Sequence, residues 1–335
     1  MNTTESIPLN ESRSLVWLRV IAMYCIVICH LFQAYHIKIW GDIFNVGVQI
    51  FFVLSGYLYG YKTIDNWKSW HLKRIKKIYI PYLVFLICVV PLFVLFHNEA
   101  MNWKALPFYF ANLQGFRFII GGSFARIEGL RHVWFLTAIM CDYLITFGLQ
   151  KIKNKSDVAI PILIALIVVA YLVLPLRIVF MLSWVYLYAF GYLYVNLTDK
   201  WKRFYSLLIV LGFVTMLCLV SGTDFNRPYS NHYRLIHDLG GLFGIIIGVR
   251  ILSRWKTIQV PKIIAFFDKY SFHVYIVHFF IMCGPFSMAY ITPYFGLNIG
   301  IMLASIVVFT SLFVQLLNII NKNIHVSKAI NSLLI

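Results

Sequence analysis

Two ionisable side chains stand in the first apolar stretch of the chain, at a spacing that puts them on one face of a helix. Residues 14–36 are long and apolar enough to cross a membrane, yet they contain Arg19 and His30. Arginine is permanently charged, whereas histidine exchanges its proton near neutral pH. Eleven residues separate the two, which places them on one helix face and roughly 16 Å apart. Because hydrocarbon disfavours such groups, that face must look into protein or a water-filled cavity.

The composition indicates what surrounds that face. The chain has 335 residues, of which 61% are hydrophobic and only 12% charged, whereas a soluble domain carries about 25% charged residues. Repeated apolar runs of helical length predict an all-α, multi-pass membrane bundle. The net charge of +17 does not indicate nucleic-acid binding, because the Lys and Arg lie between the apolar runs, where topology and lipid headgroups account for them.

We expect about ten transmembrane helices within one domain, residues 14–320, flanked by cytoplasmic tails at 1–13 and 321–335. The expected spans lie near residues 14–36, 43–61, 79–97, 132–150, 158–175, 178–196, 204–221, 236–253, 271–291 and 297–320. With the N-terminus inside, twenty-one of the 29 Lys and Arg fall on the inner side and eight on the outer side. This bias predicts that both termini are cytoplasmic. The six cysteines lie inside apolar segments without metal-site spacing, so neither a metal nor a bound cofactor is expected.

Two connections are long. The inner one, residues 62–78, interleaves basic and aromatic residues. It is either an amphipathic helix lying on anionic lipid or a cationic mouth for a phosphate-bearing substrate, and the two interpretations are compatible. The outer one, residues 98–131, is apolar enough that we expect it to pack back against the bundle.

Small residues in the second span have a structural and a functional interpretation. Ser55 and Gly56 lie midway through the bilayer, where small residues let helices approach closely and Ser can bond to its own helix. The functional interpretation gains weight from other motifs: Lys73-Arg74 through Lys77 and Pro81-Tyr82, Trp134-Phe135-Leu136, and Tyr275 through His278.

Together these motifs resemble the integral-membrane acyltransferase-3 family over nearly the whole chain. The most specific element is Arg19 followed eleven residues later by His30, and Phe51 through Tyr57 is similar to the second-helix motif. Two departures are visible. Lys77 stands where the family often has a second arginine, and the stretch Thr137 through Asp142 offers no glutamate after Trp134.

The resemblance implies a membrane O-acyltransferase that moves an acyl group, acetyl above all, from cytoplasmic acyl-CoA to a hydroxyl of an extracytoplasmic or lipid-linked polysaccharide. Capsule, exopolysaccharide and O-antigen are such polymers. Membrane lipids are the other expected partners, and the cell (inner or plasma) membrane is the expected location. His30 would be the catalytic base, either acting directly on the acceptor or first carrying the acyl group, with Arg19 as its catalytic companion.

The other site residues follow from the same resemblance. Arg74, Lys76 and Lys77 would bind the phosphates of the co-substrate, acyl-CoA. Substrate-binding or site-shaping roles fall to Ser55, Gly56, Trp134, Tyr275 and His278. The alternatives are a transporter of glycans or lipid-linked sugars, with Arg19 and His30 lining its path, and transfer to an amino group.

Overall fold

A computed structural model of the chain describes residues 7–117, 126–221, 231–255 and 259–333, and all regular structure in these ranges is helical. The first six residues and the last two of the predicted tails lie outside the described residues. The long helices are α1 (Leu9–Ala34), α3 (Gly47–Gly60), α4 (Trp67–Phe96), α7 (Trp134–Ile152), α8 (Ser156–Val173), α9 (Leu176–Tyr194), α10 (Asp199–Ser221), α11 (Asn231–Leu252), α12 (Lys262–Met282) and α13 (Phe295–Leu333).

These helices confirm the polytopic bundle. Eight stretches of the described chain are long and apolar enough to cross a membrane. One of them, Arg131–Val173, contains both α7 and α8, and α12 adds a further helix of 21 residues. Each of the ten expected spans therefore corresponds to a long helix, with α2 (Lys38–Phe44) preceding α3 in the second. Many large apolar side chains on α8, α10 and α13 are exposed, as a lipid-facing surface requires.

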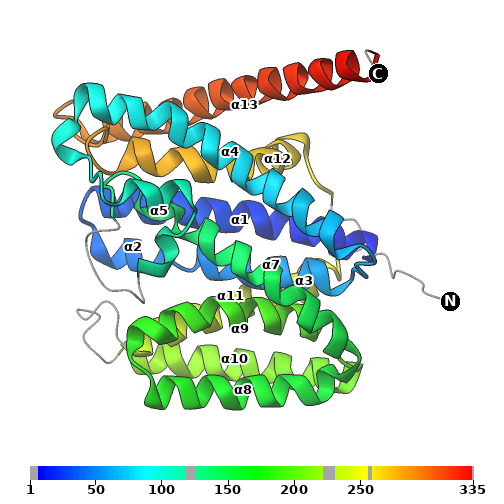
Figure 1. Cartoon of the computed structure of the whole chain (residues 1–335). Helices are drawn as coiled ribbons and strands as arrows, with labels where there is room; N and C mark the ends of the chain where they lie inside the picture. The colour runs from blue at the N-terminus through cyan, green and yellow to red at the C-terminus, as the bar shows by residue number, and fades with distance from the viewer. Residues whose placement is uncertain (1–6, 118–125, 222–230, 256–258, 334–335) are drawn as a thin grey trace.

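The helices run in one general direction and form three tiers (Figure 1). The tier at the top of the view holds α12 and α13, the middle tier α1, α3 and α7, and the lowest α8 to α11, while α4 runs obliquely from beside α3 up to the top tier. In the middle tier α1 packs against α2, α3, α11 and α12. The helix that carries Arg19 and His30 therefore has neighbours on several sides. The start of α1 and the end of α13 lie at the same end of the bundle.

The inner connection is not a separate surface helix. Asn66 caps α4 by accepting a hydrogen bond from the Ser69 amide at 2.9 Å, and the helix then continues without a break from Trp67 to Phe96. The expected interfacial helix is therefore wrong as an independent element. Its basic residues form the first turns of a spanning helix, because a good N-cap and uninterrupted helix-forming residues extend the span.

The outer connection packs back on the bundle in its described parts. It contains η1 (Asn98–Ala100), α5 (Leu106–Phe110) and η2 (Gln114–Phe116) before η4 (Arg131–Val133) leads into α7. Tyr109 is fully buried and its carbonyl accepts a hydrogen bond from the Tyr82 hydroxyl at 2.8 Å. The buried Gln114 side chain donates to the Val133 carbonyl at 2.8 Å. This connection closes one end of the bundle beside the start of α7.

Candidate active site

Two polar pairs join α1 to α12. Arg19 on α1 forms an ion pair with Asp268 on α12, with Nη1 and Oδ1 2.6 Å apart. Further along, Nδ1 of His30 and Nε2 of His278 are 2.8 Å apart. The order of these contacts shows that the two helices run in parallel, so a spacing of eleven residues on one is matched by ten on the other. The polar face of α1 therefore looks into protein, as the cost of exposing it to hydrocarbon requires.

The hydrogen bonds around His278 fix where the protons of the histidine pair lie. Nδ1 of His278 contacts two backbone carbonyls, those of Tyr275 at 2.8 Å and Val274 at 3.1 Å. A carbonyl only accepts, so this nitrogen carries the hydrogen and the opposite Nε2 of the neutral ring has a lone pair. Nδ1 of His30 must then donate to that lone pair. The Nε2 of His30 is left as an unprotonated nitrogen, which is the form that a general base needs.

A third histidine adjoins this pair. His132 is held by its Nε2, 3.0 Å from the Ile276 carbonyl, while its Nδ1 is buried without a partner in the described structure. The Tyr275 hydroxyl donates to the His132 carbonyl. The Phe279 ring lies against both His30 and His132, with centroid distances of 4.7 and 4.9 Å. His132 and His278 are 3% and 0% exposed, whereas His30 is partly exposed, so His30 is the histidine of the three that a substrate can reach.

Two loops, residues 126–131 and 283–288, meet beside His30, and we refer to them together as the mouth. The Cys283 thiol lies 3.8 Å from the His30 carbonyl. The next residue, Gly284, approaches Gly129 so closely that a Cβ there would lie 2.5 Å from the Gly129 nitrogen. Both glycines have positive φ, 81° at Gly129 and 90° at Gly284, a backbone conformation that other residues rarely adopt. Arg131, whose charge reaches His30, is 3.5 Å from the Glu128 carboxylate at the same place.

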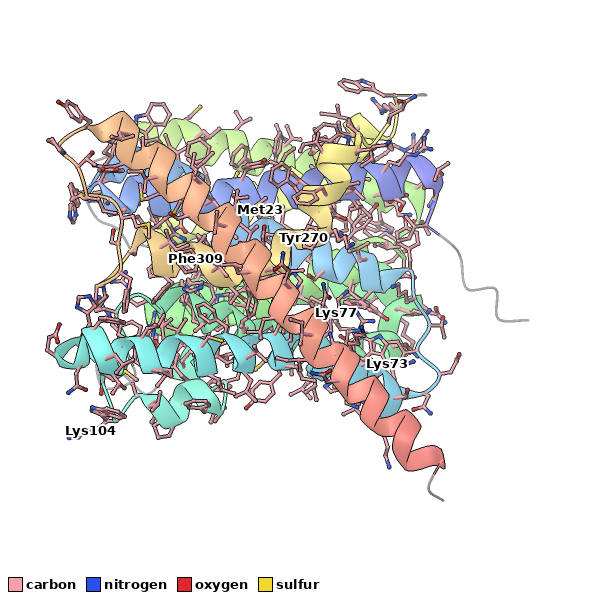
Figure 2. All side chains as sticks on the ribbon, turned by 90° about the horizontal axis from the view of Figure 1, so that it is seen from above. Met23, Lys73, Lys77, Lys104, Tyr270 and Phe309 are labelled. Carbon is pink, nitrogen blue, oxygen red and sulfur yellow. The ribbon has the colours of Figure 1, made fainter. Side chains whose placement is uncertain are left out.

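Positive charges gather at the other end of this helix face. Lys77 on α4 lies within electrostatic range of Arg19, Asp268 and Arg74. Burial, and then the charges of Arg74 and Lys77, hold the pKa of Lys62 below its usual value. Figure 2 shows Lys73 and Lys77 near the start of α4, with Lys104 beyond the opposite end. Because Lys62, Arg74 and Lys77 repel one another, their region favours the binding of an anion.

Arg74 is the most enclosed of the helical members of this cationic cluster, which we define as Lys62, Arg74, Lys76 and Lys77. Its guanidinium lies over the rings of Tyr59 and Trp70, 5.6 and 5.9 Å from their centroids. Its Nε is buried without a hydrogen-bond partner in the described structure. Lys76 and Lys77 are exposed. The aromatic rings leave hydrogen-bond donors of Arg74 available to a ligand.

The sequence profile of the acyltransferase-3 family, described as an acyltransferase domain, matches residues 13–317. The chain belongs to this family. The matched residues are therefore an acyltransferase domain, and the long apolar helices indicate a membrane protein. No solved structure matches the chain significantly.

Curated relatives of the family member described here are known from bacteria. The chain is similar to the O-acetyltransferase OatA of Staphylococcus aureus strains NCTC 8325 / PS 47, COL and MRSA252. Each is 30% identical over 174 residues, an alignment that covers 45% of this chain and 27% of the relative. The chain thus matches about a quarter of the length of these relatives.

The acyltransferase-3 motifs divide between two places in the structure. His30, His278 and Tyr275 come together at the α1–α12 interface, whereas Arg19 faces Asp268 instead of the histidines. The hydrogen-bonded His30–His278 pair, the mouth and the cationic cluster all lie at or beside this interface. No group of three potential metal ligands occurs in the described ranges.

Three predicted site residues lie elsewhere, around α9. A Cβ on Gly56 would lie 2.0 Å from the Tyr188 carbonyl, so this glycine permits the close crossing of α3 and α9. Trp134 stacks on Trp184 of α9 with ring centroids 4.7 Å apart. Ser55, beside Gly56, is partly buried. Gly56 and Trp134 therefore make helix-packing contacts that shape the bundle.

Two residues of the site were not predicted from the sequence. Neither His132 nor Asp268 is among the predicted site residues. The available signal for Asp268 was its position ten residues before His278, which nearly repeats the spacing of Arg19 and His30. That repeat has meaning only once α1 and α12 are known to be neighbours.

Proposed function

We propose that this acyltransferase moves an acetyl group from acetyl-CoA to a hydroxyl of an extracytoplasmic or lipid-linked polysaccharide, from within the cell membrane. The observation that carries the proposal is the His30–His278 pair, which leaves Nε2 of His30 unprotonated and within reach of substrate. The names of the curated relatives support the choice of O-acetyl transfer. The bound partners are a CoA thioester on one side and a glycan on the other.

The chemistry at His30 is a proton transfer in each direction. Nε2 takes the proton of the acceptor hydroxyl as its oxygen attacks the thioester carbon. The C–O bond forms, the C–S bond breaks, and the departing thiolate takes the proton back from Nε2. Between these steps the His30 ring is an imidazolium, and its Nδ1–H donates to the neutral His278. His278 thus fixes the tautomer of His30 and stabilises its transient positive charge. A buried aspartate has the same role beside the catalytic histidine of a Ser-His-Asp triad.

The acceptor side of the proposal rests on the mouth formed by residues 126–131 and 283–288. Arg131 lies in the field of His30 and its side chain is 39% exposed, so it can reach a sugar oxygen outside while remaining close to the reaction. A guanidinium there would also favour the negative oxygen of the tetrahedral intermediate. The Glu128 carboxylate keeps Arg131 oriented while the site is empty.

The CoA side rests on the cationic cluster. Phosphates are dianionic or monoanionic groups that arginine contacts with paired hydrogen bonds and lysine as a point charge. Arg74 is stacked on Tyr59, Lys77 lies on the same face of α4, and Lys76 is exposed on another face of the same turns. The Arg19–Asp268 pair lies between the cluster and His30, so it lines the route of the thioester arm.

The proposal is tested on surface glycan from a strain lacking the protein, complemented with wild type, His30→Ala or His36→Asn. His36 is an exposed histidine at the end of the same helix and serves as the matched control. We expect alkali-labile acetyl esters with wild type and His36→Asn, and a loss of about 10²–10⁴ in transfer rate with His30→Ala. Mass spectrometry before and after mild alkali measures the esters.

Three outcomes would contradict the proposal. Normal ester content with His30→Ala would show that His30 is not the catalytic base. Loss of the polymer itself in the deleted strain would favour a transporter. Acyl groups that survive mild alkali would indicate transfer to an amino group.

A further inference from the structure

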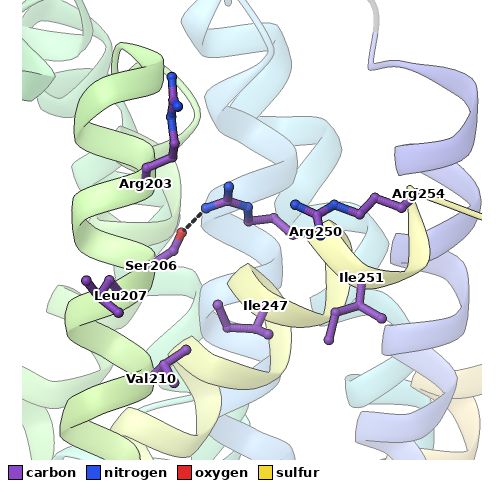
Figure 3. A pocket seen from close by; sticks show the side chains of 8 residues that line it. All are labelled: Arg203, Ser206, Leu207, Val210, Ile247, Arg250, Ile251 and Arg254. Carbon is purple, nitrogen blue, oxygen red and sulfur yellow. Dashed lines mark hydrogen bonds between the residues drawn. The ribbon is translucent and has the colours of Figure 1, made fainter.

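A cavity of about 280 Å³ opens between α10 and α11, away from the histidine site (Figure 3). It is lined by Arg203, Ser206, Leu207, Val210, Ile247, Arg250, Ile251 and Arg254. Half of these residues are aliphatic and three are arginines, and none is acidic. The lining therefore combines an apolar surface with three positive charges that no carboxylate of the cavity neutralises.

The three arginines gather at one end of the cavity. Figure 3 shows the guanidinium groups of Arg250 and Arg254 directed toward the helix that carries Arg203, above the aliphatic side chains. Arg250 is fixed there, because its Nη1 donates to the Ser206 hydroxyl at 2.6 Å. Ser206 is itself buried and donates to the Lys202 carbonyl at 2.6 Å. Like charges held together in this way favour an anion between them.

The opposite end of the cavity is apolar and open to the membrane. Leu207 and Ile251 are 59% and 52% exposed, and Val210 and Ile247 continue the surface between them. The helices that carry them, α10 and α11, belong to the lowest tier of Figure 1. A ligand that fills the whole cavity must carry an anionic group joined to a hydrocarbon chain.

The depth of the cavity agrees with that of a lipid headgroup. A Cβ on Gly248 would lie 2.8 Å from the Leu18 side chain, so the arginine end of α11 is level with the first half of α1. By the expected topology this is the cytoplasmic leaflet, whose anionic lipids attract basic groups. The cationic cluster lies at the start of α4 and just before it, where Arg74 stacks on Tyr59 of α3, and none of its residues lines the cavity, so the two positive regions are separate sites.

We propose that this cavity binds an anionic phospholipid of the cytoplasmic leaflet. Arg203, Arg250 and Arg254 contact the headgroup phosphate, and one acyl chain lies along Leu207, Val210, Ile247 and Ile251. A free phosphate gains nothing from the aliphatic half of the lining, which is why the lipid is the expected occupant. A zwitterionic lipid brings an ammonium group close to three arginines and binds less tightly.

The experiment is a titration of the purified full chain in detergent, followed by native mass spectrometry. The probes are phosphatidylglycerol, phosphatidylcholine with the same chains, and soluble glycerol phosphate. The variants are Arg203→Gln/Arg254→Gln and Lys200→Gln. Arg203 and Arg254 are exposed, so their loss spares the core, and Lys200 is an exposed cation of the same helix that does not line the cavity.

We expect phosphatidylglycerol to bind at least about tenfold more tightly than phosphatidylcholine. The double variant should lose roughly 25-fold, about fivefold for each arginine, and Lys200→Gln should stay within about twofold of wild type. Equal binding of the two lipids overturns the proposal, as does an equal loss with Lys200→Gln. Glycerol phosphate binding as tightly as phosphatidylglycerol would make this a phosphate site instead. None of these outcomes depends on the acyl-transfer reaction.

Discussion

Three histidines of the same intrinsic chemistry differ in what their two nitrogens contact. His278 uses both nitrogens, one toward backbone carbonyls and one toward His30. His132 uses one toward the Ile276 carbonyl and is almost fully buried. His30 alone of the three combines an occupied Nδ1 with partial exposure. In the proposed mechanism these contacts divide the roles: His30 reacts and His278 orients it, while His132 supports the turn from which α7 begins.

The orienting role of His278 gives a prediction that separates it from simple packing. His278→Ala removes the acceptor of the His30 Nδ1–H and should lower kcat about 10–100-fold, the usual cost of losing a residue that orients a reacting group. His278→Gln keeps an oxygen able to accept that hydrogen bond and should recover most of the loss. KM for both substrates should stay near wild type, because neither touches His278. Steady-state kinetics of the protein in nanodiscs measure both constants.

The comparison between the two variants decides the interpretation. If Gln is as damaging as Ala while both proteins fold, the acceptor function of His278 is wrong. A parallel rise of KM in both variants would instead indicate a role in binding substrate.

Residue types and spacing predict His30 and His278 as site residues, but they do not reveal Asp268. His30 follows from the cost of a histidine in an apolar helix, and His278 from the motif Tyr275 through His278. Asp268 could not be identified in this way, because the ion pair with Arg19 depends on two helices 249 residues apart in sequence being adjacent and in register. Such a contact is a property of tertiary packing.

At the scale of helices, the α1–α12 interface is held by the Arg19–Asp268 pair at one end and by the histidines at the other. The side chains of Arg19 and Asp268 are only 27% and 17% exposed. Each charge is therefore poorly hydrated and is stabilised by the other. We expect Arg19→Ala and Asp268→Ala each to lower the melting temperature of the detergent-purified protein. The double variant should be less destabilised than the sum, by about 1 kcal/mol, the size found for polar contacts between membrane helices.

A distant pair provides the control for this cycle. Arg19→Ala combined with Lys200→Gln should be additive, because the two residues share no contact. Additivity in the Arg19–Asp268 cycle as well would mean that the ion pair contributes no stability, and Arg19 would then be free to act on substrate alone.

The crossing of α3 and α9 depends on glycines on both helices. Besides Gly56, Gly191 approaches the Val53 carbonyl so that a Cβ would lie 2.3 Å away, whereas Gly148 on α7 has open space around it. Gly56→Ala should therefore force the helices apart and cost about 1–3 kcal/mol or more. Gly148→Ala should be neutral or slightly stabilising, since alanine favours the helix by about 1 kcal/mol.

The readout distinguishes packing from catalysis at Gly56. We expect Gly56→Ala to lower the yield of folded, monodisperse protein in size-exclusion chromatography, with the Gly148→Ala protein eluting like wild type. Normal folding of Gly56→Ala together with lost transfer would give this glycine a place in the site. The sequence pattern could not decide between these roles, because a small residue in a membrane helix serves both.

At the scale of the whole molecule, the number and order of the long helices were predicted from the sequence, but the first and last residues of several were not. Each expected span overlaps one long helix, since apolar length is a strong signal. Two borders near the end of the chain are wrong: α12 is Lys262–Met282 where residues 271–291 were expected, and α13 continues to Leu333 through the expected tail at 321–335. A third difference is α4, which begins at Trp67 where the span was expected near residue 79. Charged residues hide the first turns of such a helix from a hydropathy argument, although lysine and arginine form helices well and keep their charges at the membrane surface.

The direction of the bundle across the membrane links every site described above. Both termini lie at one end, and the charge count predicts that this end is cytoplasmic. In that orientation Lys155, the last residue of η5 (Lys153–Lys155), is inside, and Lys104 is outside. A membrane-impermeant maleimide applied to intact cells should label Lys104→Cys and leave Lys155→Cys unlabelled until the cells are opened. The wild-type chain, which retains its six cysteines, gives the background.

The opposite labelling would reverse the molecule, and the consequences would reach beyond topology. The cationic cluster on α4 would then face the exterior, where CoA thioesters are not supplied, and the mouth beside His30 would open to the cytoplasm. The three arginines between α10 and α11 would meet the outer leaflet, which lacks the excess of anionic lipid that their charge requires. One labelling experiment therefore constrains the source of the acyl group, the side of the acceptor and the leaflet of the bound lipid together.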